Sequence, residues 1–328
     1  MNKKTLQGML FLFIATWAWG VAFVAQSVGT GYMNAFAFNC IRNFIGAAVL
    51  VPVIIFRERK SLSDSNSPRQ KLMETNDFSK IQEAPRQNKR FIPPLLLGGI
   101  VCGTALCISA NFQQLGIEYS TVGKSAFITT LYIVFVPILG IFLKKKVPFG
   151  TWIGVILSLI GLYLLCMKNE VFFIGQGDIY LLLCAFCYSI QILLVDYFVQ
   201  KTDPIKLSAL EFLFCGIFSG IGMLFTEIPS WSNIIGSAIP LLYAGAVSTG
   251  IGFTLQVVGQ KHVPASIASL IMSLESVIAA LAGWVLLHEI LSRKELFGCG
   301  LVFVAIIITQ LPLEKIKYKI RRKKETPS

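Results

Sequence analysis

The sequence is poor in charge and in histidine. Only 14% of its 328 residues are Asp, Glu, Lys or Arg, against about 25% in a soluble globular protein. This excludes a water-soluble chain. The two histidines, His262 and His288, have no ligand-spaced partners and no Ser and Asp companions, so the sequence predicts no metal site and no catalytic triad. We expect no catalytic residue and no cofactor.

Long apolar runs take the place of charge, and 55% of the residues are hydrophobic. A helix needs about 20 apolar residues to cross the hydrocarbon core, whereas barrel strands are shorter and alternate apolar with polar residues. Segments of the helical kind lie at 6–25, 33–56, 92–114, 122–143, 148–167, 178–199, 206–226, 236–258, 263–287 and 295–313. The sequence therefore predicts an all-α integral membrane protein with ten transmembrane helices.

The basic residues predict the orientation of the chain. Ten spans place both termini on one side, and with the termini in the cytoplasm 24 of the 29 Lys and Arg lie on that side and four on the other. The positive-inside rule therefore places the termini, the polar loop 57–91 and the basic tail 314–328 in the cytoplasm. The expected location of the protein is the plasma membrane. The basic clusters lie between apolar runs, so lipid headgroups, not nucleic acid, are their expected partners.

The sequence contains an internal repeat. Residues 152–157 line up with 296–301 at an offset of 144, and residues 38–43 line up with 207–212 at an offset of 169. The first half is therefore longer by 25 residues, which loop 57–91 supplies.

Each repeat holds five spans, over residues 1–167 and 168–313. An odd number of spans inverts the second repeat relative to the first. Many secondary transporters use this arrangement to alternate access around a site near the bilayer midplane.

Several segments carry a resemblance to a known family: Trp17-x-x-Gly20-x-x-Phe23, Asn39-x-x-Arg42, the run 126–137, Leu274-Glu275-Ser276-Val277, and Leu287-His288-Glu289 with Gly298. In these segments the chain resembles the EamA-type branch of the drug/metabolite transporter superfamily. The resemblance implies export of amino-acid-like metabolites or amphipathic compounds. One position departs from it, because Lys145 stands where the family often has a Glu that closes the fourth span.

Glu275 is the leading candidate for the site, because polar and ionisable groups inside spans are costly and usually face a cavity or a partner. It shares a face of its span with Ala268, Met272 and Ala279, beside a stripe of small residues suited to close helix packing. We expect it to bind a solute or a proton. The alternative is a structural carboxylate bonded to a neighbouring helix.

Other polar groups in spans extend the candidate site. Arg42 and Glu211 occupy equivalent repeat positions with opposite charge, which predicts a gate or an ion pair between the halves, or else two local pairs. Asn111, Tyr132 and Gln191 line a predicted solute pathway, with interhelical hydrogen bonds as the alternative. Further polar candidates are Gln113, Gln114, Asp196 and Gln256.

Trp17 lies in mid-span, away from the interfacial belts, and is a candidate cavity wall unless it packs against lipid or helices. Gly99-x-x-x-Gly103 and Gly216-x-x-x-Gly220 permit close helix crossings, within the bundle or in a homodimer.

The leading functional prediction is a secondary transporter, an exporter of a small-molecule solute by alternating access, with proton coupling through Glu275. Two alternatives stay open. A non-transporting scaffold or sensor would not require buried polar residues or an inverted repeat. An intramembrane enzyme would need a Ser/His pair or an Asp-rich metal motif within the spans, and the sequence has neither.

Overall fold

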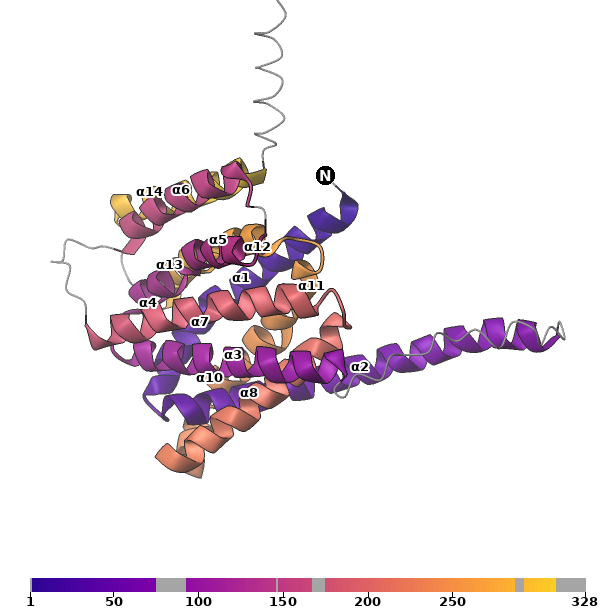
Figure 1. The fold of residues 1–328 in the computed structure, drawn as a ribbon. Coiled ribbons are helices and arrows are strands. Elements are labelled where there is room, and N and C mark those ends of the chain that lie inside the picture. The colour runs from indigo at the N-terminus through magenta and orange to yellow at the C-terminus, as the bar shows by residue number, and fades with distance from the viewer. Residues whose placement is uncertain (1, 75–92, 146, 167–174, 287–291, 311–328) are drawn as a thin grey trace, which may run out of the picture.

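The computed structural model describes residues 2–74, 93–145, 147–166, 175–286 and 292–310. All regular structure within these ranges is helical (Figure 1), which confirms the all-α class. In chain order the helices are α1 (Lys3–Thr30), α2 (Ala35–Glu74), α3 (Pro94–Glu118), α4 (Val122–Thr129), α5 (Tyr132–Phe142), α6 (Phe149–Cys166), α7 (Gln176–Phe198), α8 (Pro204–Thr226), α9 (Trp231–Gly236), α10 (Ala238–Leu242), the π-helical stretch η2 (Tyr243–Phe253), α11 (Thr254–Gln260), α12 (Ala265–Met272), α13 (Leu274–Leu286) and α14 (Arg293–Gln310).

Eight helical segments in the described ranges are long and apolar enough to cross a membrane. They are Lys3–Thr30, Ala35–Lys60, Pro94–Glu118, Val122–Phe142, Gln176–Phe198, Pro204–Thr226, Ala238–Gln260 and Ala265–Leu286. Two shorter apolar helices, Phe149–Leu164 and Leu296–Ile308, lie where the fifth and tenth spans are predicted. For these two segments, spanning stays a prediction.

Helix α2 runs further than expected. The sequence places a polar loop from residue 57, whereas α2 continues as a helix to Glu74. The first part of the predicted loop is therefore helical. Residues 75–91 lie outside the described ranges.

Two predicted spans are each built from two helices. The fourth breaks between α4 and α5, and the ninth breaks at Ser273 between α12 and α13. At both breaks a hydroxyl turns back onto its own helix, with Thr130 Oγ1 donating to the Phe127 carbonyl at 2.8 Å and Ser273 Oγ to the Leu270 carbonyl at 2.7 Å. Such back-bonding bends helices. Ser276 Oγ, 2.9 Å from Thr130 Oγ1, joins the two broken spans.

The helices pack in a regular pattern. Helix α1 contacts η2, α11, α12 and α13, while α7 contacts α3, α4 and α5. Helix α2 contacts α8 and η2, α3 contacts α8, α4 contacts α13, and α6 pairs with α14 along one side of the bundle (Figure 1).

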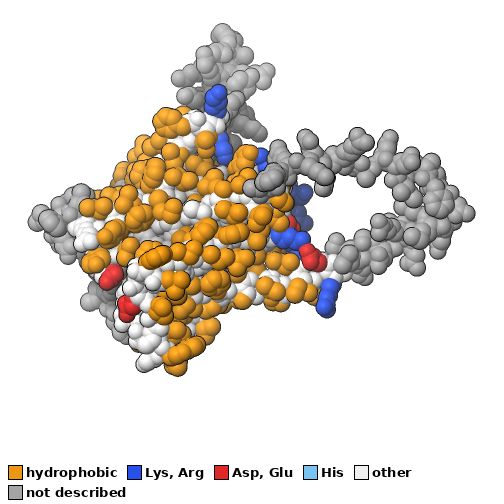
Figure 2. Space-filling view, turned by 60° about the horizontal axis from the view of Figure 1, so that its bottom comes forward, with side chains coloured by type: hydrophobic (Ala, Val, Ile, Leu, Met, Phe, Trp, Pro, Cys, Tyr) orange, Lys and Arg blue, Asp and Glu red, His pale blue; other side chains and the backbone are white. Residues whose placement is uncertain are grey.

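The outside of the bundle is apolar, and its ends are polar. Figure 2 shows a broad hydrophobic surface with Lys and Arg gathered near the end at which α2 leaves the bundle. We call this the inner end, and the opposite one the outer end. At the inner end α2 is tied to α8, where Lys206 Nζ lies 2.6 Å from Glu58 Oε1 and Arg57 Nη1 lies 3.6 Å from Asp203 Oδ2.

Candidate functional site

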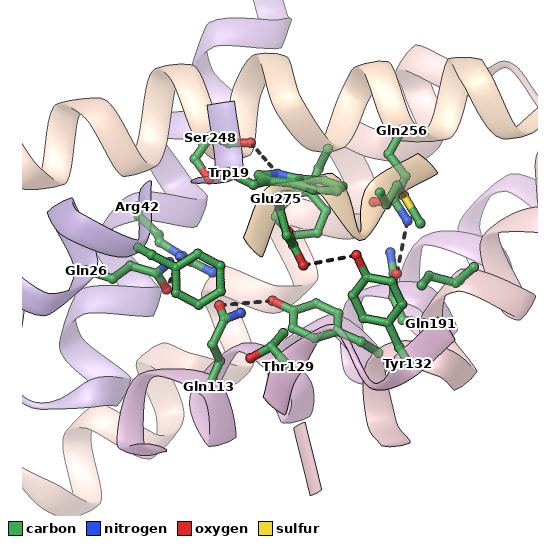
Figure 3. Close-up of a pocket in the computed structure, with 15 residues that line it drawn as sticks. Trp19, Gln26, Arg42, Gln113, Thr129, Tyr132, Gln191, Ser248, Gln256 and Glu275 are labelled. Atoms are coloured by element: carbon green, nitrogen blue, oxygen red, sulfur yellow. Dashed lines mark hydrogen bonds between the residues drawn. The ribbon is translucent and has the colours of Figure 1, made fainter. Parts of the chain in front are cut away.

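A cavity of about 30 Å³ lies in the middle of the bundle. Its wall takes residues from α1, α2, α3, α4, α5, α7, η2, α11, α12 and α13 (Figure 3). The lining residues are Trp19, Phe23, Gln26, Arg42, Gln113, Thr129, Tyr132, Tyr188, Gln191, Ile192, Ser248, Phe253, Gln256, Met272 and Glu275. One water needs about 10–15 Å³ on this scale. The cavity therefore has space for about two waters, and its lining side chains are buried.

Arg42 brings a buried cation to the cavity wall. Its side chain is 2% exposed, and Nη1 donates to Gln26 Oε1 at 3.0 Å. Nε has no hydrogen-bond partner. Within the described ranges no carboxylate lies at ion-pair distance from this guanidinium. The cation therefore faces the cavity with unused donors.

Glu275 brings a buried carboxyl group to the same cavity. It is 5% exposed, and Tyr132 Oη donates to its Oε1 at 3.0 Å (Figure 3). The break at Ser273 places Glu275 in the first turn of α13, where the free backbone N–H groups of a helix favour a carboxylate. No Lys, Arg or His of the described chain pairs with it.

Aromatic rings make up much of the remaining wall. Trp19 and Phe253 have ring centroids 4.8 Å apart, and Tyr188 stacks on Phe253 at 6.4 Å. Trp19 Nε1 donates to the Ser248 carbonyl at 3.3 Å. Both Ser248 and Phe253 belong to η2, and π-helical turns inside α-helices are frequent at functional sites.

A chain of glutamines leads from the cavity toward the inner end. Gln256 Nε2 lies 3.3 Å from Gln191 Oε1 and 3.0 Å from Gln260 Oε1. Gln191 Nε2 also donates to Glu211 Oε1 at 2.7 Å.

Gln260 lines a second, wider hollow of about 360 Å³, which we call the vestibule. Its other lining residues are Val136, Pro137, Gly140, Lys145, Val147, Leu193, Asp196, Gln200, Lys261, His262, Val263, Pro264, Ala265 and Ser266.

The structure brings most of the predicted site residues together. Tyr132, Gln191, Glu275 and Arg42 line the cavity, so the polar positions inside the spans lie around one space. Among the further candidates Gln113 and Gln256 also line it, Asp196 lines the vestibule, and Gln114 donates to the Gln26 carbonyl at 3.0 Å.

The placement of Trp17 in the cavity wall is wrong. Trp17 is 52% exposed and packs edge to face on Phe13, with ring centroids 6.5 Å apart. Two residues rotate a helix by about 200°, so Trp19 lines the cavity instead. In the sequence, the polar residue Gln26 marks the face of α1 that points inward. Trp19 and Phe23 lie on the same face, because the three residues are spaced by four and three positions.

Asn111 does not line the cavity either. Its amide donates to the Cys107 carbonyl at 2.8 Å and to Ser219 Oγ at 3.0 Å, and its oxygen accepts from Asn39 at 3.1 Å. It is held in an interhelical network, the alternative expected for it.

Arg42 and Glu211 form no ion pair with each other, since each hydrogen-bonds to a glutamine of its own half. Arg42 lies about two turns from the outer end of α2, whereas Glu211 lies about two turns from the inner end of α8. Their opposite depths explain why the two charges do not meet.

Comparison with known proteins gives concordant results. The model of the EamA-like transporter family matches residues 6–167 and 175–311. An uncharacterized transporter of Archaeoglobus fulgidus is 26% identical over 94% of this chain and 87% of its own length. The uncharacterized transporter YoaV of Bacillus subtilis is 25% identical over 94% of this chain and 98% of its own length. A crystal structure of a protein of 15% identity shares the fold with a TM-score of 0.71, over 97% of this chain and 99% of that one.

Proposed function

Since this chain belongs to the EamA-like transporter family, we propose that it is a secondary transporter that exports a small organic solute by alternating access, with the central cavity as its solute site. The observation that carries the proposal is the pair of buried charges on that cavity. Arg42 and Glu275 face the same space, and neither has a partner of opposite charge among the described residues.

Two inverted five-helix repeats, over residues 1–167 and 168–313, are the proposed architecture. The packing supports it, because exchanging the halves turns each contact into another observed one. The α1 contacts with η2, α12 and α13 become those of α7 with α3, α4 and α5. The α4–α13 contact becomes that of α5 with α12, while α2–α8 and α6–α14 map onto themselves. The breaks near Thr130 and at Ser273 also correspond at the 144-residue offset. The family model likewise matches two successive stretches.

The charges define the proposed solute. A carboxylate on the solute would meet the unused donors of Arg42, and an ammonium group would meet Glu275 and Tyr132. Trp19 and Phe253 offer aromatic faces to an apolar side chain. An amino-acid-like zwitterion fits all three features.

Export is the proposed direction. The termini are predicted to be cytoplasmic, which makes the inner end the cytoplasmic one. The vestibule of about 360 Å³ lies at that end, and Gln260 in its wall is hydrogen-bonded to Gln256 in the cavity wall. A solute from the cytoplasm would therefore meet a wide approach before the cavity.

Efflux from proteoliposomes tests the proposal. The protein is reconstituted with radiolabelled L-phenylalanine inside, and parallel samples contain phenethylamine or 3-phenylpropionate, which each lack one charge. We expect L-phenylalanine to leave fastest. Arg42→Gln and Glu275→Gln should each slow its efflux by about tenfold or more, because a charge-assisted hydrogen bond contributes about 1.5–3 kcal/mol.

Trp17→Phe is the matched control, because Trp17 lies outside the cavity, and it should export at the rate of the unmodified protein. Efflux of all three compounds at the rate of protein-free liposomes would contradict the proposed solute class. Equal slowing by Trp17→Phe would show that the cavity is not the site.

A further inference from the structure

Two ion pairs join the same two predicted spans at opposite ends of the bundle. At the outer end, Lys124 Nζ of α4 lies 2.8 Å from Asp178 Oδ2 of α7. At the inner end, Lys145, just beyond α5, pairs with Asp196 of α7. We call the contact of α4 and α5 with α7 the clasped seam.

The middle of the clasped seam contributes to the cavity wall. Thr129 and Tyr132 line the cavity from one side of the seam, and Tyr188 and Gln191 line it from the other. Between the cavity and the inner end, Lys145 and Asp196 both line the vestibule. The two ion pairs therefore lie on either side of the cavity along one seam, and a solute passing along it must pass one of them.

The local backbone places each pair. Asp178 lies in the first turn of α7, where it also accepts from the Gly175 N–H at 2.9 Å. At the other end the chain turns through Lys144, which has a positive φ of 57°, and the Lys145 N–H donates to the Gly140 carbonyl at 2.9 Å. This turn ends α5 and brings Lys145 to the vestibule.

Both pairs are weak enough to open and close. The lysine side chains are 34% and 38% exposed, while Asp178 and Asp196 are 8% and 17% exposed. Water therefore reaches the lysine of each pair, and breaking the pair costs less than it would if both partners were buried. Such a contact can hold one state without trapping it.

The seam related to this one by the repeat is built differently. There α1 packs on α12 and α13, and a Cβ at Gly20 would lie 2.5 Å from Ile278 and 2.9 Å from the Glu275 carbonyl. Within the described ranges no ion pair joins these helices. One seam is thus closed by tight backbone packing, and the other by breakable charge contacts.

We propose that the two ion pairs are the latches of the transport cycle. Lys124–Asp178 holds the outer mouth of the cavity shut, and Lys145–Asp196 holds the inner mouth shut. Each breaks when its own side opens, and the structure, with both pairs formed, stands between the two open states. This inference rests on the proposed function, because only a transporter needs the two mouths to open in turn.

Labelling of a cysteine in the cavity tests the latches. Ser248→Cys, in a background without the eight native cysteines, places a thiol at the cavity wall. A membrane-impermeant maleimide is applied to intact cells and to inside-out vesicles. Asp178→Asn should raise labelling from the side of residue 178 and lower it from the other, and Asp196→Asn should do the reverse. We expect changes of about two- to fivefold, the effect of one exposed ion pair on an equilibrium constant.

The charge swaps Lys124→Asp with Asp178→Lys, and Lys145→Asp with Asp196→Lys, should return each rate toward that of the Ser248→Cys parent. Glu58→Gln is the matched control, because it breaks an exposed ion pair with Lys206 at the inner end but outside the clasped seam. It should leave labelling unchanged. Size-exclusion profiles show which variants are folded.

The outcomes separate the two proposals. If the parent is labelled from both sides and neither Asp→Asn variant changes the rates, the latches are overturned while alternating access stands. Increases from both sides at once in either variant would also overturn them. If folded parent and variants are all unlabelled from both sides, the cavity never opens and the proposed function fails with them.

Discussion

Arg42 and Glu275 are held in the bundle by neutral partners, Gln26 and Tyr132. A charged side chain at the centre of a span costs about 2.5–3.5 kcal/mol on insertion scales. A single hydrogen bond to a neutral group offsets part of this cost. A group of opposite charge would offset the rest. The cavity therefore favours an occupant that brings both charges.

We predict that Glu275→Gln uncouples transport from the proton gradient. Glutamine keeps the shape and accepts the hydrogen bond from Tyr132, but it cannot take up or release a proton. The variant should insert normally and still exchange labelled solute across proteoliposomes, at a rate lowered about tenfold by the lost contact with the ammonium group. Its efflux should lose acceleration by a pH gradient. A low folded yield, with residual efflux that stays gradient-dependent, would instead make Glu275 structural.

The buried polar side chains were the predictable part of the site. Tyr132, Gln191 and Glu275 stand out in the sequence because each is polar in an apolar span. Trp19 does not stand out, since aromatic residues also occur on lipid-facing surfaces. Only its position on the same helix face as Gln26 shows that it faces inward. The positions of polar residues in the sequence also do not show that Asn111 makes its hydrogen bonds to neighbouring helices and not to the cavity.

At the scale of the helix, close contacts and breaks shape the cavity. The break at Ser273 starts a new helix beside Glu275, and the close approach of α1 to α13 at Gly20 brings Trp19 up to the cavity. The ends of the apolar segments were predictable to within a few residues. The breaks were not, because no Gly or Pro stands at Thr130 or Ser273 and back-bonding hydroxyls replace them.

We predict that Gly20→Ala destabilises the protein by about 1–3 kcal/mol, the cost of an added methyl group in a packed interior. The new Cβ would lie 2.5 Å from Ile278 and must push α1 and α13 apart. Thermal unfolding in detergent measures the loss. Gly31→Ala is the control, because φ at Gly31 is −71° and its added Cβ would meet only the Val28 carbonyl, at 3.5 Å. Equal losses in both variants would contradict the packing argument.

We predict that about 25 residues of Ser61–Gln87 can be removed with little loss of folding or transport. The second half does without this segment, and the free energy of loop closure changes only slowly with length. Helix α2 reaches its last span residue at Lys60, so the deletion spares the bundle. Membrane yield and solute efflux are the measurements. A variant that inserts well but does not transport would show that the segment regulates or gates.

For the whole molecule, the two halves are alike in packing and unlike in chemistry. Equivalent positions carry Arg42 in one half and Glu211 in the other, and the seam of α4 and α5 with α7 carries ion pairs that its counterpart lacks. The sequence predicts the repeat from segments that line up at fixed offsets, and the similar packing of the two halves supports it. The ion pairs were not, because their partners lie 54 and 51 residues apart in sequence.

We predict that the inner end faces the cytoplasm, because 24 Lys and Arg lie on that side against four on the other. Moving that many cations across the membrane opposes the bias that orients spans. Single cysteines at Ser67 and at Ser328, in the background without native cysteines, should therefore resist an impermeant thiol reagent in intact cells and react once the cells are permeabilised. A cysteine at Tyr119, which is 56% exposed in the turn between α3 and α4 at the outer end, should react without permeabilisation. Labelling of residues 67 and 328 from outside would reverse the orientation. Labelling of only one of them would place the loop and the C-terminal tail on different sides, and the eight spans predicted between them would then be wrong.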